Sequence, residues 1–325
     1  MKETTYEKIM KYMEGHESAT AKELVDFSGI TKQALFRHLK KMIENGELIK
    51  TGMPPKVFYS INKEGAATII KFQSEIEEIL KNNYLIITPS GEMKEGSEGF
   101  TYWCKRNNLD PIKTSLEYVK ILEKYNKYRL KSGLIDGISK MKSTFPEVYL
   151  DKLFYVDFYS IERFGKTKLG QLLLYAKQSQ NKPMMKTISM LIKDKAAKII
   201  DNCKIDGIGF IPPTVKREVQ LMKEIENNLN LQYRKVNLTK VRTGVIVPQK
   251  TLNKLEDRIE NASNSIFIQD NNTYNNILLI DDAVGSGATL NEVAKKIKNS
   301  GICKGKIIGL AIAGSFKGFD VISEV

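Results

Sequence analysis

Residues 277–290, ILLIDDAVGSGATL, constrain the fold of this chain more than any other stretch. They begin with four apolar residues that suit a buried strand, and the helical pattern NEVAKKIKNSG follows them. Two adjacent carboxylates, Asp281 and Asp282, and a loop of small residues lie between the strand and the helix. At the carboxyl end of a strand, glycines let backbone N–H groups approach an anion, and the next helix adds the positive end of its dipole. The order predicts an α/β fold with a phosphate-binding loop.

Two common phosphate-binding motifs do not fit this stretch. A Walker-type loop needs GxxxxGK[ST], and no lysine follows Gly287. A dinucleotide-binding fold places its glycines first and its acid about 20 residues later, which is the reverse order. What remains is a loop that grips one phosphate beside two carboxylates that can accept hydrogen bonds from two hydroxyls. The alternative is a Rossmann-like strand that ends in a solvated acid pair.

The stretch resembles the phosphoribosyl pyrophosphate (PRPP) motif of type I phosphoribosyltransferases. The resemblance implies that Asp281 and Asp282 hold the ribose 2- and 3-hydroxyls. It also implies that the following loop wraps the 5-phosphate, with help from the hydroxyls of Ser286 and Thr289. This loop has Gly285-Ser286-Gly287 where the family more often has Thr-Thr-Gly. The expected phosphate loop consists of Ala283, Val284, Gly285, Ser286, Gly287, Ala288 and Thr289.

Residues 154–315 are similar to the ComF-like branch of that family in the order of their motifs. These motifs are a lysine-rich helix, a strand ending in proline with arginine nearby, a loop with Arg-Thr and Gln, and an arginine with asparagine three residues on. Many ComF-like proteins begin with a cysteine zinc ribbon, whereas the three cysteines here form no CxxC pair. The matching residues are Lys177, Pro212 to Arg217, Arg242, Thr243, Gln249, Arg258 and Asn261.

The residue types in this sequence are sufficient for the chemistry of such a site. Displacement of pyrophosphate from the anomeric carbon passes through an oxocarbenium-like state, so a protein mainly positions the partners and neutralises the leaving group. We expect Mg²⁺ as cofactor, held mainly through PRPP rather than by a protein metal cluster. With only two histidines, the chain offers no histidine-rich metal site. The cations expected to meet the pyrophosphate are Lys216, Arg217, Arg242 and Arg258.

A different pattern occupies the first sixty residues. Apolar spacing predicts a helix from Thr4, and Thr20 and Thr31 can cap two further helices that end at Gly29 and Gly46. The patterns ELIKTG and KVFYSI then predict a hairpin around Pro54-Pro55. This order resembles the winged helix-turn-helix family of bacterial DNA-binding domains over about residues 4–62.

In that reading, the helix after Thr31 buries one face and shows polar donors on the other. The expected groove-facing residues are Lys32, Gln33, Arg37, His38 and Lys41, and Lys50 and Lys56 flank the wing where they could reach phosphates. A winged helix that serves as a protein–protein or dimer module is the alternative.

The positive charge of the chain lies in its middle. Residues 1–100 carry 14 basic and 15 acidic side chains, residues 101–250 carry 29 and 14, and residues 251–325 carry 8 and 9. The excess could meet nucleic acid or another polyphosphate. Residues 88–99, TPSGEMKEGSEG, contain turn formers without periodicity, and we expect the linker there.

We therefore expect a winged helix-turn-helix domain in residues 1–65, a helical connector in 66–150, and a phosphoribosyltransferase-like domain in 151–325. The last is expected to be α/β, with a mostly parallel sheet flanked by helices. No apolar run is long enough for a membrane span and the first residues are charged, so we expect a cytoplasmic protein.

Three functions are compatible with this organisation. The first is an enzyme that transfers or hydrolyses a phosphoribosyl or nucleotide base–sugar linkage and is targeted to DNA or structured nucleic acid. The second is a non-catalytic transcription regulator that senses PRPP or a nucleotide. The third is a phage-defence effector, similar in layout to retron effectors and held by a DNA-containing partner. A homodimer or a nucleoprotein complex is the expected assembly.

Overall fold

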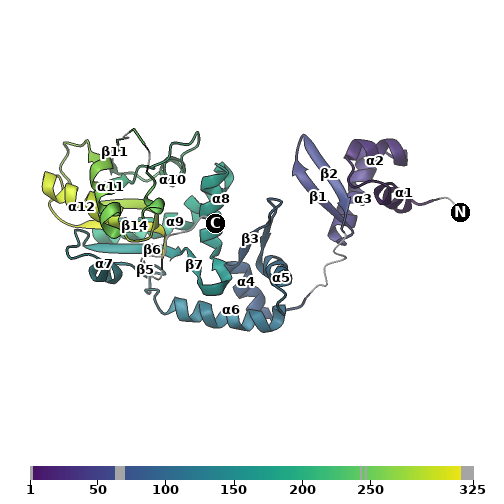
Figure 1. Ribbon diagram of the computed structural model, residues 1–325, viewed down its shortest axis with the longest axis horizontal. Coiled ribbons are helices and arrows are strands. Elements are labelled where there is room, and N and C mark those ends of the chain that lie inside the picture. The colour runs from purple at the N-terminus through teal and green to yellow at the C-terminus, as the bar shows by residue number, and fades with distance from the viewer. Residues whose placement is uncertain (1–2, 63–69, 242–243, 246, 316–325) are drawn as a thin grey trace. The chain divides into compact units, whose positions relative to one another are not determined.

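The computed structural model describes residues 3–62, 70–241, 244–245 and 247–315 (Figure 1). The chain divides into two compact units, one of residues 1–71 with 88–92 and the other of residues 72–87 with 93–325. Each unit has hydrophobic cores of its own. Within the described ranges, no helix combines the length and the apolar character needed to span a bilayer.

Three helices and a hairpin make up the first unit. Thr4, Thr20 and Thr31 each precede a helix, and their side chains accept a hydrogen bond from a backbone N–H of the first turn. The predicted helices and hairpin are therefore confirmed as elements. They are α1 (Thr5–Glu14), α2 (Ala21–Ser28), α3 (Lys32–Glu44), β1 (Leu48–Met53) and β2 (Lys56–Ile61).

The core of this unit joins all five elements. Ile9, Leu24 and Leu35 are buried at its centre, and Tyr59 of β2 packs with them. Ala19, between α1 and α2, exchanges two backbone hydrogen bonds with Tyr59, of 2.8 and 2.7 Å. The hairpin is thus tied to the helices by backbone pairing as well as by apolar contact.

A six-stranded sheet organises the second unit. Its order is β10-β9-β13-β14-β6-β5, and every neighbouring pair is parallel except β5 with β6, which is antiparallel. The predicted mixed α/β fold with a mostly parallel sheet is confirmed. The strands are β5 (Ile135–Asp136), β6 (Lys152–Phe158), β9 (Gly207–Phe210), β10 (Arg234–Lys235), β13 (Ile277–Val284) and β14 (Ile307–Gly314).

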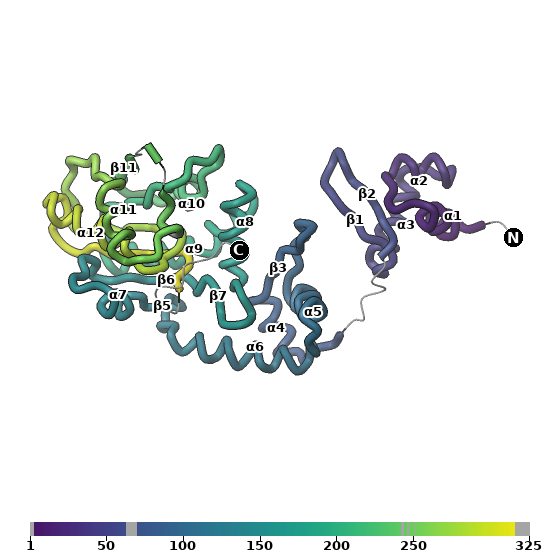
Figure 2. The backbone as a smooth tube through the Cα atoms, viewed as in Figure 1, coloured from purple at the N-terminus to yellow at the C-terminus, as the bar shows by residue number. Residues whose placement is uncertain are grey.

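Helices cover both faces of this sheet. Along β13, Ile277 and Leu279 join the core on one face, and Leu278 and Ile280 join the core on the other, as strand alternation requires. This is why the central strands are apolar throughout. Helices α8 (Lys168–Gln178), α9 (Lys182–Cys203) and α10 (Leu221–Leu229) contribute to one core, and α7 (Ile138–Thr144), α11 (Leu255–Ser265) and α12 (Ala288–Ser300) to the other. Figure 2 traces the backbone of these helices.

The expected linker at residues 88–99 is wrong. Gly91, at φ +82°, turns a hairpin between β3 (Leu85–Ile87) and β4 (Met93–Glu95), and α5 (Gly96–Arg106) follows at once. A Cβ on Gly96 would lie 3.2 Å from the backbone of Lys81 in α4 (Ser74–Asn83), so this glycine allows two helices to approach closely. Of the glycines in this stretch, Gly91 therefore forms a turn and Gly96 permits close packing.

The segment expected as a helical connector shares the core of the sheet. It supplies the edge strand β5 and α6 (Pro111–Asn126), and Tyr118 of α6 packs edge-on against Phe164 with ring centroids 5.0 Å apart. Phe100 of α5 lies 5.0 Å from Tyr84 in the same cluster. The remaining short elements are β7 (Ser160–Ile161), η1 (Glu162–Phe164), β8 (Gly165–Lys166), β11 (Leu238–Lys240), η2 (Gln249–Thr251) and β12 (Ile266–Ile268).

Candidate phosphate-binding site

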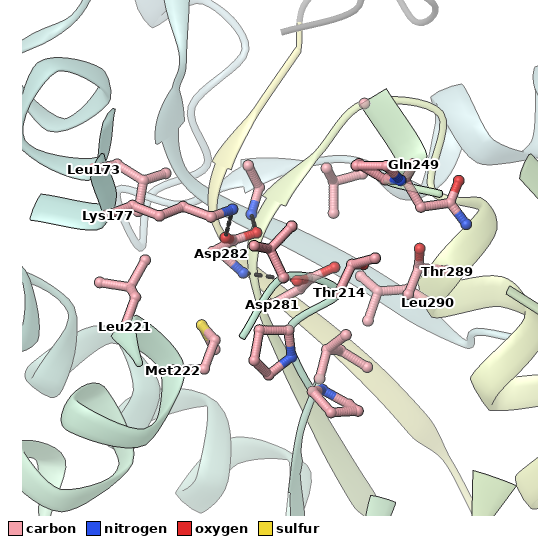
Figure 3. Close-up of a pocket in the computed structure, with 18 of the residues that line it drawn as sticks. Leu173, Lys177, Thr214, Leu221, Met222, Gln249, Asp281, Asp282, Thr289 and Leu290 are labelled. Carbon is pink, nitrogen blue, oxygen red and sulfur yellow. Dashed lines mark hydrogen bonds and ion pairs between the residues drawn. The ribbon is translucent and has the colours of Figure 1, made fainter. Parts of the chain in front are cut away.

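A cavity of about 250 Å³ opens at the carboxyl ends of the neighbouring strands β9 and β13. The loop after β9 forms one wall, and the loop after β13 with the start of α12 forms another. Leu173 of α8 with Leu221 and Met222 of α10 adds an apolar side (Figure 3). Ligands of open α/β sheets bind at this edge, because the strand ends and helix N-termini converge there.

The acid pair occupies the floor of this cavity. Asp281 is 8% exposed, and its Oδ1 accepts the backbone N–H of Asp282 at 2.8 Å. Asp282 is held more firmly, because its Oδ1 accepts the N–H of Ala283 at 2.7 Å and its Oδ2 accepts from Lys177 Nζ at 2.5 Å. Figure 3 shows Lys177 reaching this carboxylate from the side of Leu173.

The two carboxylates differ in their ease of ionisation. Burial, and then the adjacent charge of Asp282, raises the pKa of Asp281 to about 8. Burial also opposes ionisation of Asp282, but the Lys177 ammonium and the Ala283 N–H overcome it, so the pKa of Asp282 lies below its usual value. One acid of the pair can therefore hold a proton at neutral pH while the other stays charged.

The loop after the acid pair presents backbone donors to the cavity. Within the described residues, no hydrogen bond uses the amide N–H groups of Gly285, Ser286 or Gly287. A Cβ on Gly285 would meet nothing nearer than Arg258 Nη1 at 3.7 Å, so this backbone is open to a ligand. The first N–H groups of α12 lack intrahelical partners by helix geometry, and Ser286 Oγ accepts that of Ala288. The arrangement suits a phosphate at a helix N-terminus.

Two contacts fix the shape of the loop. Gly287 caps α12 at φ +88°, and a Cβ there would lie 3.2 Å from Sδ of Met141. One turn on, Asn291 is 2% exposed, and its side chain bonds the backbone of Glu147 and Tyr149 at 2.9 Å each. The loop is thus supported from α7 and from the segment before β6.

The four cations expected to bind pyrophosphate differ in where they lie relative to the cavity. Arg217 lines the cavity, whereas Lys216 is exposed and is not among the described lining residues. Arg242 lies outside the described residues. Arg258 lines the cavity but is only 5% exposed, with its Nε bonded to the carbonyl of Leu252 at 2.7 Å.

Two lysines that line the cavity, Lys177 and Lys240, are not among the residues expected to bind the ligand. Lys177 belongs to the ComF-like pattern, but nothing local indicates that it meets Asp282, 105 residues away. Lys240 ends the short strand β11, and its Nζ donates to Thr214 Oγ1 at 2.7 Å. Burial lowers the pKa of Lys240, and the Asp281 carboxylate partly offsets this. No sequence motif marks this residue.

The expected nucleic-acid contacts lie on one helix and the hairpin of the first unit. Lys32, Gln33, Arg37 and Lys41 are exposed on α3, and His38 is half-buried. Lys50 of β1 and Lys56 of β2 are exposed as well. Phe36, on α3 beside Lys32, is 42% exposed, and the Lys32 Nζ lies 5.9 Å from its ring centroid. The exposed part of α3 thus combines cations with an aromatic ring.

Comparison with known proteins adds little to this geometry. No protein-family model and no curated protein matches the chain. Among solved structures, the chain is similar to a crystal structure of a hypoxanthine phosphoribosyltransferase from Staphylococcus aureus. The identity is 12%, 43% of this chain and 80% of that chain are covered, and the TM-score is 0.22. A likeness of this extent supports no argument about the site. Within the described residues, no three His, Cys, Asp or Glu side chains gather as a metal cluster.

Proposed function

We propose that the cavity binds the 5-phosphoribosyl group of PRPP or of a nucleotide, and that the protein transfers or hydrolyses the bond at the anomeric carbon. One juxtaposition supports this proposal. The unengaged N–H groups of residues 285–287 lie directly after the Asp281–Asp282 pair, in one cavity. A sugar phosphate carries an anion and a vicinal diol, which are the groups that such donors and acceptors bind.

The carboxylates fit Mg²⁺ as a partner of this ligand. Carboxylate oxygens are ligands that Mg²⁺ prefers, and the ion also takes oxygens from substrate phosphates. The ion would be held mainly through the oxygens of PRPP, with Asp281 and Asp282 as neighbouring carboxylates in the cavity, and it would supply charge neutralisation of the leaving group. The protein itself orients the sugar through the loop and the acid pair.

The test is isothermal titration calorimetry with PRPP and Mg²⁺, followed by measurement of pyrophosphate release in the presence of nucleobases and nucleotides. Wild type is compared with Asp281→Asn/Asp282→Asn. We expect wild type to bind, and the double variant to lose at least about tenfold in affinity, because the negative charge of Asp282 and one acceptor oxygen of each acid are removed. Equal binding by both proteins, or none by wild type, would refute the proposal.

A ligand-sensing regulator would use the same cavity without turnover. Pyrophosphate release separates the two functions, because a sensor binds PRPP and leaves it intact. We also propose that the first unit binds DNA through α3 and the hairpin, on the strength of the exposed cations of α3. In the regulator, PRPP would change DNA affinity. In a defence effector, a DNA-containing partner would inhibit turnover instead.

A further inference from the structure

Lys240 connects two cavities that adjoin at the edge of the sheet. A second cavity, of about 390 Å³, lies over β11 and α11 and shares Thr214 and Lys240 with the first. Lys240 is placed there by the β11–β12 pairing, in which it stands opposite Ile266, and Val241 donates its N–H to the Ser265 carbonyl at 2.8 Å. Its backbone position is therefore set by a hydrogen-bonded sheet.

The ammonium of Lys240 has an incomplete set of partners. It is half-buried, and it donates to one neutral hydroxyl, that of Thr214. No carboxylate forms an ion pair with it among the residues that the structure describes. A buried charge without a counter-ion is unfavourable, so an anion beside this group would bind strongly.

Two of the other three cations that line the first cavity are already engaged, and the third, Arg217, comes from the same loop as Thr214. Lys177 is paired with Asp282 at 2.5 Å, and Arg258 donates its Nε to the carbonyl of Leu252. Lys240 and Asp281 line the same cavity, and the Asp281 carboxylate opposes the lowering of the Lys240 pKa by burial. Thr214 belongs to the loop after β9 and Thr289 to the start of α12, and both line this cavity. The two positions suit two separate anionic groups of one ligand.

We propose that Lys240, with Thr214, binds the second anionic group of the ligand, the pyrophosphate at the anomeric carbon, while the loop of residues 285–289 holds the 5-phosphate. This assignment rests on the proposed function for the identity of the ligand. Lys240 lies on the separate two-stranded sheet β11-β12, and it takes the pyrophosphate-binding role that was expected for the exposed Lys216. Lys240 is a binding residue here, and it assists departure of pyrophosphate by neutralising its charge.

Calorimetry with three probes tests the assignment, each in the presence of Mg²⁺: PRPP, ribose 5-phosphate and inorganic pyrophosphate. The variants are Lys240→Met and Lys240→Arg, and Lys223→Met removes an exposed lysine of α10 as the matched control. We expect Lys240→Met to lower the affinity for PRPP and for pyrophosphate by about tenfold to a hundredfold, since a charged hydrogen bond is lost. The affinity of Lys240→Met for ribose 5-phosphate should change by less than about twofold. The affinity of the control Lys223→Met for all three probes should also change by less than about twofold.

Each outcome supports or overturns the Lys240 assignment or the proposed function. Unchanged PRPP affinity in Lys240→Met, or equal weakening of PRPP and ribose 5-phosphate, would overturn the assignment and leave the proposed function standing. If wild type binds pyrophosphate through Lys240 but not ribose 5-phosphate, the anion site holds and the phosphoribosyl function fails. If wild type binds none of the three probes, both the Lys240 assignment and the proposed function are overturned. Lys240→Gln is measured in parallel, because it removes the charge but keeps a hydrogen-bond donor for Thr214. If Lys240→Met fails to fold, the Gln variant provides the comparison with wild type.

Discussion

Asp281 and Asp282 are adjacent in the chain and have opposite electrostatic surroundings. Asp282 accepts from Lys177 and is charged, whereas buried Asp281 faces the charge of its neighbour. Ionisation of a buried carboxyl group beside a charged neighbour costs free energy, so the raised pKa of Asp281 has a consequence for the stability of the protein.

The first prediction concerns Asp281 and pH. Its pKa of about 8 lies above the unfolded value of about 3.9, so the folded chain keeps a proton that the unfolded chain releases. The free energy of unfolding should therefore fall as pH rises through this window, and Asp281→Asn should flatten the fall between pH 5 and 8 by an amount on the order of 4 kcal/mol. Urea unfolding at pH 5, 6, 7 and 8 measures it. Parallel curves for variant and wild type would contradict the interpretation.

The second prediction concerns Gly287. An alanine there is strained at φ +88° and its Cβ presses on Met141, so Gly287→Ala should weaken ribose 5-phosphate binding by roughly tenfold or more. Gly301→Ala is the control, because Gly301 ends the same helix at φ +71° with no atom within 4 Å of the added Cβ. It carries similar backbone strain away from the cavity. Equal ligand affinity in both variants would show that the loop shape is unimportant.

At the scale of elements, the order of strand, acid pair, loop and helix places the loop amides and the start of α12 at one point. The same scale explains α3 in the first unit. Its apolar residues Leu35 and Leu39 are buried, so the opposite side of the helix, with Arg37 and Lys41, faces solvent. Helix capping by Thr31 starts the helix where this amphipathic pattern begins.

The third prediction tests α3. Arg37→Ala and Lys41→Ala should each weaken duplex DNA binding and reduce the slope of log affinity against log salt by about one, if each side chain contacts a phosphate. Lys22→Ala, on the exposed side of α2, removes the same charge elsewhere in the unit. Fluorescence anisotropy at several salt concentrations measures the slopes. Identical slopes for the α3 variants and the Lys22 variant would assign the binding to net charge rather than to this helix.

At the scale of the whole molecule, each unit encloses its own core. The second unit extends further toward the N-terminus than composition indicates, because α4, α5 and α6 pack into the core that also contains β13 and β14. The segment that looks like a connector is therefore part of the domain that bears the candidate site.

The fourth prediction follows from this packing. Phe100 of α5 is fully buried against Tyr84 and Tyr118, so Phe100→Ala should lower the free energy of unfolding of the second unit by about 3–5 kcal/mol. Tyr102→Ala, at a half-buried position on the same helix, should cost much less. Chemical denaturation followed by far-UV circular dichroism gives both values. A negligible effect of Phe100→Ala would mean that α5 does not contribute to the stability of this core.

Features that depend on neighbouring residues can be predicted from the amino-acid sequence: capped helices, the hairpin, and the succession of buried strand, Asp281–Asp282, glycine loop and helix. Periodicity, capping and glycine conformations act within a few residues. The folded chain is needed to show that Lys177 meets Asp282, that Lys240 lines the cavity, that Arg258 is buried, and that Gly96 serves close packing. Those outcomes depend on contacts between residues far apart in the chain, and no local pattern encodes which distant side chains the packed sheet and helices bring together.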